Sequence, residues 1–253
     1  MVLQQETGEF LEGLKNEFES TFGELIPGII HDFASPLNGI MGRCELLERR
    51  AHRTLERVAG GVHTAGNDLM EDCQKIHADA NVLTREADRL FDLFNKVSEK
   101  FRTLKDTAVQ EINLSELVEA EVRFLRFYPE IKHSVEHILH LEREVPEVNG
   151  IRADYSMALS AIIRHAIDSM MESEARKLVI TTGYDDSHVF IRVEDTGAPR
   201  ETIREGEIPP LPSHTSNGNR GLFCAVSLLK KHDVLFGVTH ASGVNITSVR
   251  VPY

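Results

Sequence analysis

Apolar residues recur at alternating spacings of four and three over most of residues 33–104, and this spacing constrains the fold more than any other feature of the chain. It gives a helix one continuous apolar stripe, and helices with such stripes pack side by side at about 20°. Gly60 and Gly61 interrupt the pattern, so it predicts two helices joined by a turn. The first stripe comprises Phe33, Leu37, Ile40, Cys44, Leu47, Ala51, Thr54 and Val58, and the second comprises Leu69, Cys73, Ile76, Ala80, Leu83, Ala87, Leu90, Phe94, Val97, Phe101 and Leu104.

The two stripes together are too extensive for one hairpin to bury. Pairing two hairpins into a four-helix bundle covers both stripes, so we expect a homodimer. The same spacing places Cys44 and Cys73 on the stripes, where we expect them in the core.

The periodicity changes near residue 112, where the pattern predicts a linker and then a helix from Glu116 to Phe127, with Ser115 as its cap and Pro129 as its end. Strand-like alternation follows at 135–141, 178–184, 189–193, 234–239 and 244–251, with helical patterns at 155–172 and 222–232. Strands interleaved with helices indicate a two-layer α/β sandwich, with its last hairpin at Ser242 and Gly243. We therefore expect an α + α/β protein with two domains, 1–110 and 111–253.

Composition excludes several classes of protein. A net charge of −12 argues against a nucleic-acid binder, which needs basic residues to neutralise phosphates. The three cysteines are widely spaced, which argues against a disulfide framework or a zinc site and fits the reducing cytoplasm. No apolar run approaches the roughly 18 residues of a membrane span, so we expect no membrane segment in this chain.

Residues 30–40 read Ile-His-Asp-Phe-Ala-Ser-Pro-Leu-Asn-Gly-Ile. This segment resembles the phospho-acceptor box of histidine kinases, whose pattern is His, an acidic residue, two variable positions, Thr or Ser, Pro and Leu. His31, Asp32, Ser35, Pro36 and Leu37 meet it at every position. The resemblance implies that His31 accepts a phosphoryl group, and that Asp32 and Ser35 assist as catalytic residues.

The chemistry of these residue types agrees with the resemblance. Phe33 and Leu37 belong to the apolar stripe, which we expect to be buried, so His31 should face away from it. An exposed imidazole has one nitrogen available to attack phosphorus, while Asp32 can accept a hydrogen bond from the other. Pro36 removes a backbone hydrogen bond and predicts a bend in the helix just after the histidine.

The second half resembles the Bergerat-type ATPase domain that follows the helical bundle in histidine kinases. Val193-Glu194-Asp195-Thr196-Gly197 is similar to the first glycine box, and Gly218-Asn219-Arg220-Gly221-Leu222 lies where the second is expected. The resemblance implies that Asp195 bonds the adenine amino group. If ATP binds, the binding residues it implies are Asp195, Gly197, Gly218 and Gly221.

Several positions depart from that family's pattern. Ala161 and His165 replace its two asparagines, and imidazole is a poor substitute for the oxygen ligands that Mg²⁺ prefers. Pro199 stands where the next glycine of the first box is expected. In the second box Asn217, Asn219 and Arg220 stand where Gly, Gly and Leu are expected, and side chains at the glycine positions obstruct a close approach of phosphates. The sequence therefore assigns no cofactor with certainty and leaves ATP with Mg²⁺ open. It assigns no metal site of the protein's own.

The leading hypothesis is a cytoplasmic two-component phosphotransferase, similar to the stand-alone histidine phosphotransferases of bacterial phosphorelays. His31 would exchange its phosphoryl group with the aspartate of a response-regulator receiver domain. Two alternatives stay open: an ATP-dependent histidine kinase core that phosphorylates its own His31, and a non-catalytic pseudokinase scaffold. The expected partners are a second copy of the chain and the receiver domain, and neither nucleic acid nor a membrane.

Overall fold

The computed structural model describes the backbone of residues 2–60, 66–207 and 217–253, and the side chains of these residues apart from 2–22, 24, 66–67, 129–130 and 217–220. The chain divides into two compact units. One is Ile26–Val97, and the other combines Met1–Leu25 with Ser98–Tyr253.

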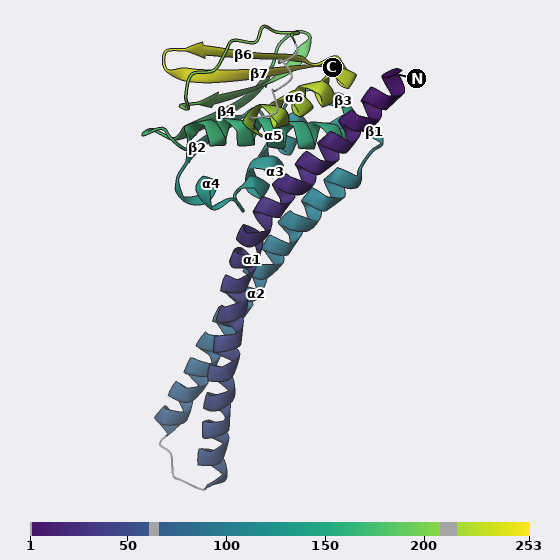
Figure 1. The fold of residues 1–253 in the computed structure, drawn as a ribbon. Helices are drawn as coiled ribbons and strands as arrows, with labels where there is room; N and C mark the ends of the chain where they lie inside the picture. Colours follow the sequence, from purple (N-terminus) through teal and green to yellow (C-terminus); the bar gives the residue numbers. More distant parts are fainter. Residues whose placement is uncertain (1, 61–65, 208–216) are drawn as a thin grey trace. The chain divides into compact units, whose positions relative to one another are not determined.

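The first unit is a helical hairpin. Helix α1 (Val2–Ala59) and helix α2 (Gly66–Lys105) supply its two arms (Figure 1). α1 ends at Ala59, where the amide of Gly60 donates to the carbonyl of Glu56 at 2.8 Å. The predicted pair of helices and the end of the first at the glycine pair are thus confirmed. In the part of the chain that the structure describes, none of the helices combines the length and the apolar character that a bilayer crossing needs.

Charged side chains join the two arms of the hairpin. Asp79 of α2 is only 3% exposed, and it accepts hydrogen bonds from Arg43, at 2.8 Å, and from Arg50 of α1. Further along, Arg57 donates to Asp72 at 2.6 Å. A buried carboxylate requires such partners, because an unpaired charge in this position would strongly destabilise the hairpin.

Many apolar residues of the hairpin lie on its outside instead. Leu37 is 47% exposed and Val58 is 58% exposed, while Cys44 and Cys73 are exposed as well. Leu37 and the two cysteines are thus exposed in the single chain, whereas their burial was expected in a bundle of two hairpins and stays a prediction. The physical reason is that a spacing of four and three marks an apolar stripe on a helix without stating which neighbour covers it.

The second unit is built around a mixed sheet with the strand order β2-β4-β5-β7-β6. β2 pairs with β4 in parallel, and the other neighbours pair antiparallel. A smaller antiparallel sheet, not expected from the sequence, pairs β1 (Val109–Ile112) with β3 (Val148–Ile151). The main strands are β2 (Glu136–Leu141), β4 (Lys177–Tyr184), β5 (His188–Asp195), β6 (Leu235–Ala241) and β7 (Val244–Pro252), close to the predicted ranges.

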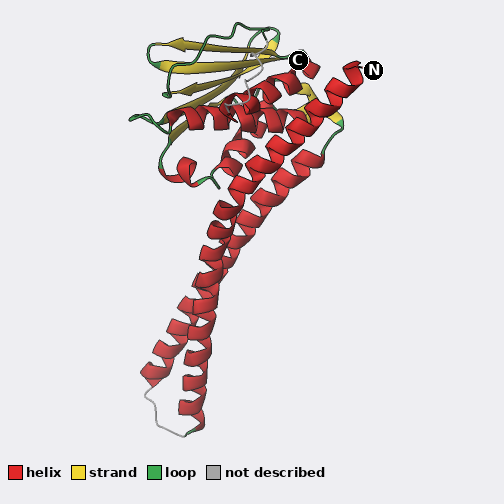
Figure 2. Cartoon of the chain, in the orientation of Figure 1, coloured by secondary structure: helices red, strands yellow, loops and turns green. Residues whose placement is uncertain are grey.

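Helices cover one face of this sheet (Figure 2). Alternate residues of the strands, such as Ile180, Ile191 and Val249, are at most 1% exposed and pack beneath the helical layer. The predicted two-layer α/β sandwich is thereby confirmed. The helices are α3 (Leu114–Leu125), α4 (Pro129–His133), α5 (Arg152–Met170), α6 (Asn217–Leu229) and the short 3₁₀ helix η1 (Lys230–His232).

The start of α3 differs from the prediction. Asn113 is the cap, since its side-chain oxygen accepts a hydrogen bond from the amide of Glu116 at 3.1 Å. Ser115 is buried one position inside the helix, where its hydroxyl lies 2.6 Å from that of Thr182. The helix ends at Leu125, and Pro129 begins α4 rather than ending α3. Both Asn and Ser are good caps, and only the tertiary contact with β4 separates them.

Tyr155, near the start of α5, is the largest fully buried side chain among those described. Its ring stacks on that of His232 with 5.0 Å between centroids, and its hydroxyl has no hydrogen-bond partner among the described residues. Burial raises the pKa of Tyr155 to about 12, and the charge of Asp154 adds to this effect.

We expect Tyr155→Phe to change the free energy of unfolding at pH 7 by less than about 1 kcal/mol, because no hydrogen bond is lost. Since the pKa is raised on folding, the unfolded chain loses this proton first as the pH rises from 10 toward 12. Over that range the native protein should lose stability relative to the variant. Urea unfolding of the native protein and the variant, followed by circular dichroism at pH 7 and across pH 10–12, measures the difference in their free energies of unfolding. A large loss at pH 7 would contradict the absence of a partner.

Candidate functional site

His31 lies on the exposed surface of α1, with 81% of its side chain accessible. Its Nδ1 is 3.3 Å from Oδ1 of Asp32, whose own side chain is 15% exposed. The hydrogen bonds described for this ring involve Nδ1 and leave Nε2 without a partner among the described residues. With an ionised Asp32 as acceptor, the proton resides on Nδ1 and the lone pair on Nε2.

The other residues of the box surround this pair on the same helix. Ser35 is exposed one turn beyond Asp32, and Leu37 is exposed beside it, while Pro36 is buried. Pro36 has no N–H to donate to the carbonyl of Asp32, yet α1 continues through it to Ala59. The box therefore stands on a continuous helix, with the ring of His31 exposed and its apolar residues partly so.

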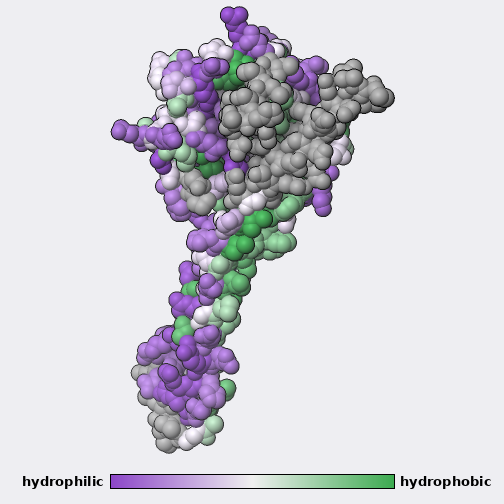
Figure 3. Space-filling model, in the orientation of Figure 1, coloured by the Kyte–Doolittle hydropathy of each residue, from purple (hydrophilic) through white to green (hydrophobic). Residues whose placement is uncertain are grey.

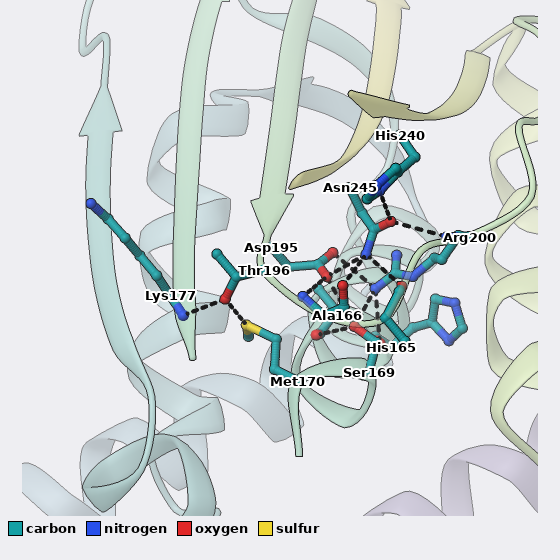
Figure 4. A network of polar contacts seen from close by, with 12 residues as sticks. His165, Ala166, Ser169, Met170, Lys177, Asp195, Thr196, Arg200, His240 and Asn245 are labelled. Atoms are coloured by element: carbon teal, nitrogen blue, oxygen red, sulfur yellow. Dashed lines mark hydrogen bonds and ion pairs between the residues drawn. The ribbon is translucent and has the colours of Figure 1, made fainter. Parts of the chain in front are cut away.

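A second polar cluster lies in the α/β unit, at the end of β5 (Figure 4). Asp195 is completely buried. Its Oδ1 accepts hydrogen bonds from the hydroxyl of Ser169 at 2.9 Å, the amide of Gly197 at 3.0 Å and the side chain of Asn245 at 2.9 Å. Three elements thus meet at one carboxylate: the end of α5, the end of β5 and the start of β7.

Arg200 neutralises this carboxylate. Its Nη2 donates to Oδ2 of Asp195 at 2.8 Å, to the hydroxyl of Ser169 at 2.7 Å and to the backbone carbonyl of His165 at 3.3 Å. The side chain is only 12% exposed, and its Nε and Nη1 are buried without a hydrogen-bond partner among the described residues. Burial lowers the pKa of Arg200, and the charge of Asp195 opposes that shift.

Gly197 is needed where it stands. A Cβ at this position would collide with the hydroxyl and the backbone of Ser169 and with the carboxylate of Asp195. The loop after β5 can approach the end of α5 this closely only because the residue has no side chain. Asp195 and Gly197 were both predicted from the sequence, and the structure brings them together.

The structure describes the surroundings of only some of the remaining residues predicted from the sequence. Gly218 and Gly221 both lie near the start of α6. Gly221 is half-buried, whereas the surroundings of Gly218 lie outside the described side chains. His165 contributes its backbone carbonyl to the cluster. Within the described residues, no group of three His, Cys, Asp or Glu side chains lies close enough together to hold a metal ion.

Arg200 and Asn245 were not identified from the sequence. Asn245 is paired with Asp195 in the register of β5 and β7, so only the sheet brings it to the site. Arg200 follows Asp195 by five positions in a loop, where no periodicity indicates that its side chain turns back to the carboxylate. The glycine box itself was the only signal available.

Replacing Arg200 with Met should lower the free energy of unfolding by about 3–5 kcal/mol, because it leaves Asp195 charged, buried and unpaired. Adding Asp195→Asn should recover part of the loss. The matched control is Arg192→Met on β5, where the arginine is 53% exposed and 4.0 Å from Glu194, and the expected change is within about 0.5 kcal/mol. Urea unfolding of the four proteins measures these differences. Equal effects of the two arginine variants would contradict the pairing.

Comparison with known proteins finds similarity to histidine kinases. No protein-family model matches the sequence. Sporulation kinase A of Bacillus subtilis is 22% identical over 227 residues, which are 90% of this chain and 33% of that protein. The signal transduction histidine-protein kinase AtoS of Escherichia coli is 22% identical over 231 residues, 90% of this chain and 34% of that protein. The chain thus spans about a third of the length of these relatives.

Among solved structures, the catalytic domain of the histidine kinase ThkA aligns with 57% of this chain and 97% of its own. The sequence identity is 20% and the TM-score is 0.48. The sequence relatives match nine-tenths of the chain, so the similarity includes both the helical hairpin and the α/β unit. On this similarity, together with the acceptor box on α1, the chain is a histidine-kinase-like protein.

Proposed function

We propose that this chain carries a phosphoryl group on His31 and exchanges it with the aspartate of a response-regulator receiver domain in two-component signalling. The observation that carries the proposal is the geometry of His31. Its ring is 81% exposed, and its Nδ1 faces the carboxylate of Asp32. A partner protein can therefore reach Nε2 without any rearrangement of the hairpin.

The transfer requires only groups that are present at this surface and on the partner. The lone pair of His31 Nε2 attacks the phosphorus of the partner's aspartyl phosphate, and the bond from phosphorus to the aspartyl oxygen breaks. The aspartate leaves as a carboxylate and the phosphoryl group remains on the ring as a phosphoramidate. Positive charge develops on the ring during the attack, and the Asp32 carboxylate beside Nδ1 stabilises this charge. The reverse steps return the group to the partner.

The Asp195 cluster supports a source of phosphate other than ATP. The family resemblance implies that Asp195 bonds the adenine amino group. Here its Oδ2 accepts from Arg200, its Oδ1 accepts three further hydrogen bonds, and the residue is completely buried. A carboxylate offers about four acceptor positions, so the base would have to displace an internal partner. The residues present do not fit a bound adenine.

Two other functions stay open as alternatives. The two curated relatives are kinases, which favours an ATP-dependent core that phosphorylates its own His31. A pseudokinase scaffold would need the hairpin but not the acceptor box. Such a scaffold has no use for an exposed imidazole held beside a carboxylate, so the His31 geometry counts against it.

The exposed apolar side chains of the hairpin support a homodimer. Figure 3 shows hydrophobic surface on the middle part of the hairpin, while the lower end is mostly hydrophilic on this face. Exposed apolar surface of this kind marks an interaction site, and a second copy of the hairpin is the occupant that completes a four-helix bundle. The large apolar residues concerned are 47–68% exposed and comprise Ile26, Ile30, Leu37, Met41, Leu55, Val58, Met70, Phe91 and Phe94.

The acceptor role is tested by offering the purified chain two labelled donors in turn: Mg-ATP, and receiver domains phosphorylated with labelled acetyl phosphate. We expect acid-labile label from a receiver and none from ATP. His31→Ala should abolish the label. His52→Ala should keep it, because His52 lies on the same helix with 73% of its side chain exposed.

The outcomes separate the three functions. Label from ATP that His31→Ala removes would establish the autokinase and contradict the interpretation of the Asp195 cluster. A folded chain that takes label from neither donor would favour the scaffold. Label that persists in His31→Ala would show that another residue is the acceptor.

The dimer is tested by the double substitution Leu55→Glu, Val58→Glu, at positions that are 68% and 58% exposed. Burying two unpaired carboxylates in the bundle is strongly unfavourable, so the variant should sediment as a monomer at concentrations where the native chain is a dimer. Arg53→Glu, at an exposed position of the same helix, is the matched control and should leave the dimer intact. Sedimentation equilibrium gives the masses. A double variant with dimeric mass would place the interface elsewhere.

A further inference from the structure

Lys100, near the end of α2, is a buried cation outside both sites described above. Its side chain is only 4% exposed. The ammonium donates to Oε2 of Glu121 at 2.5 Å, to the hydroxyl of Ser156 at 2.8 Å and to the hydroxyl of Ser160 at 2.9 Å. The ring of Phe124 lies 5.5 Å from Nζ on another side. These contacts come from α3 and α5, two helices of the α/β unit.

The cluster satisfies its own hydrogen-bonding groups. An ammonium has three donors, and each has an acceptor here. Glu121, with a side chain 2% exposed, accepts from Lys100 and Ser160 on one oxygen and from Ser156 on the other, the latter at 2.5 Å. Burial lowers the pKa of Lys100, and the charge of Glu121 opposes that shift.

We propose that Lys100 and Glu121 form a buried ionic clasp that fixes the last two turns of α2 to the helical layer of the α/β unit. If either charge stayed buried while its partner was displaced, it would be left desolvated and without a counter-ion. Because a buried unpaired charge is strongly destabilising, the pair tolerates few other positions of this end of α2. The end of α2 is therefore a fixed part of the α/β unit, and not a hinge.

The clasp also constrains α5. Ser156 and Ser160 bind it on the first half of that helix, while the carbonyl of His165 and the hydroxyl of Ser169 bind the Asp195 cluster on the second half. The position of α5 is thus set by two buried ion pairs. The clasp does not depend on the chemistry at His31, so its test is independent of phosphoryl transfer.

The test replaces Lys100 with Met in the full chain. Glu121 then remains buried without its cation, and the carboxyl group takes up a proton on folding rather than stay charged. When a carboxyl group is protonated in the folded state and ionised in the unfolded state, the folded protein loses stability as the pH rises. The unfolding temperature of the variant should fall on the order of 10 °C below that of the native chain near pH 7, and by much less near pH 5.

Hydrogen exchange measures directly whether the clasp holds the end of α2 in place. Amides of residues 98–105 should lose protection in Lys100→Met. They should keep it in Lys96→Met, the matched control, because Lys96 lies one turn earlier on the same helix and is exposed. The double variant Lys100→Met, Glu121→Gln removes the buried charge altogether. It should lose the pH dependence and regain much of the unfolding temperature.

Three results would overturn the clasp. One is a Lys100→Met variant as stable and as protected as Lys96→Met. Another is an unfolding temperature that falls equally at pH 5 and pH 7, which indicates lost packing alone. The third is a double variant whose unfolding temperature is no higher than that of Lys100→Met. This comparison decides the question even where the single variant does not fold.

Discussion

A completely buried carboxylate governs the architecture of the α/β unit. Asp195 ends β5 with no exposed surface, so its charge has to be neutralised within the protein. Arg200 does this, and the partners that share the carboxylate, Ser169 and Asn245, hold the end of α5 and the start of β7 in place. The loop after β5 passes very close to Ser169 at the end of α5, and Gly197 permits this approach because it has no side chain. The geometry of the whole strand-end region follows from one charge that cannot reach water.

The same principle operates at the other half of α5. There Lys100 of α2 and Glu121 of α3 are buried together, with Ser156 and Ser160 as additional partners. Ion pairs of this kind contribute less to net stability than equivalent apolar packing, but they tolerate few alternative arrangements, because each displaced partner leaves a charge unpaired. α5 is therefore specified in position by polar contacts at both ends, while its apolar face supplies the burial that stabilises the layer.

The site on α1 is organised in the opposite way. His31 is exposed, and its immediate partner is its own neighbour in the chain, Asp32. This arrangement needs little from tertiary structure, so a local motif was sufficient to predict that His31 is exposed beside Asp32. The hairpin interior beneath was not predictable to the same degree. Asp79, Arg43 and Arg50 meet across the two arms, whereas the apolar stripes identified from the spacing are only partly covered in the single hairpin.

By itself the sequence determined what depends on neighbours along the chain: the two long helices and the end of the first at Gly60, the main strands, His31 beside Asp32, and Asp195 beside Gly197. Hydrophobic periodicity and short motifs are local, and these features are local too. Tertiary structure alone decided that Asn113 rather than Ser115 caps α3 and that β1 pairs with β3. It also decided that Arg200 pairs with the carboxylate of Asp195. Each of these outcomes rests on a contact between residues whose proximity no local pattern records, because it is the fold that brings such groups together and burial that makes their pairing obligatory.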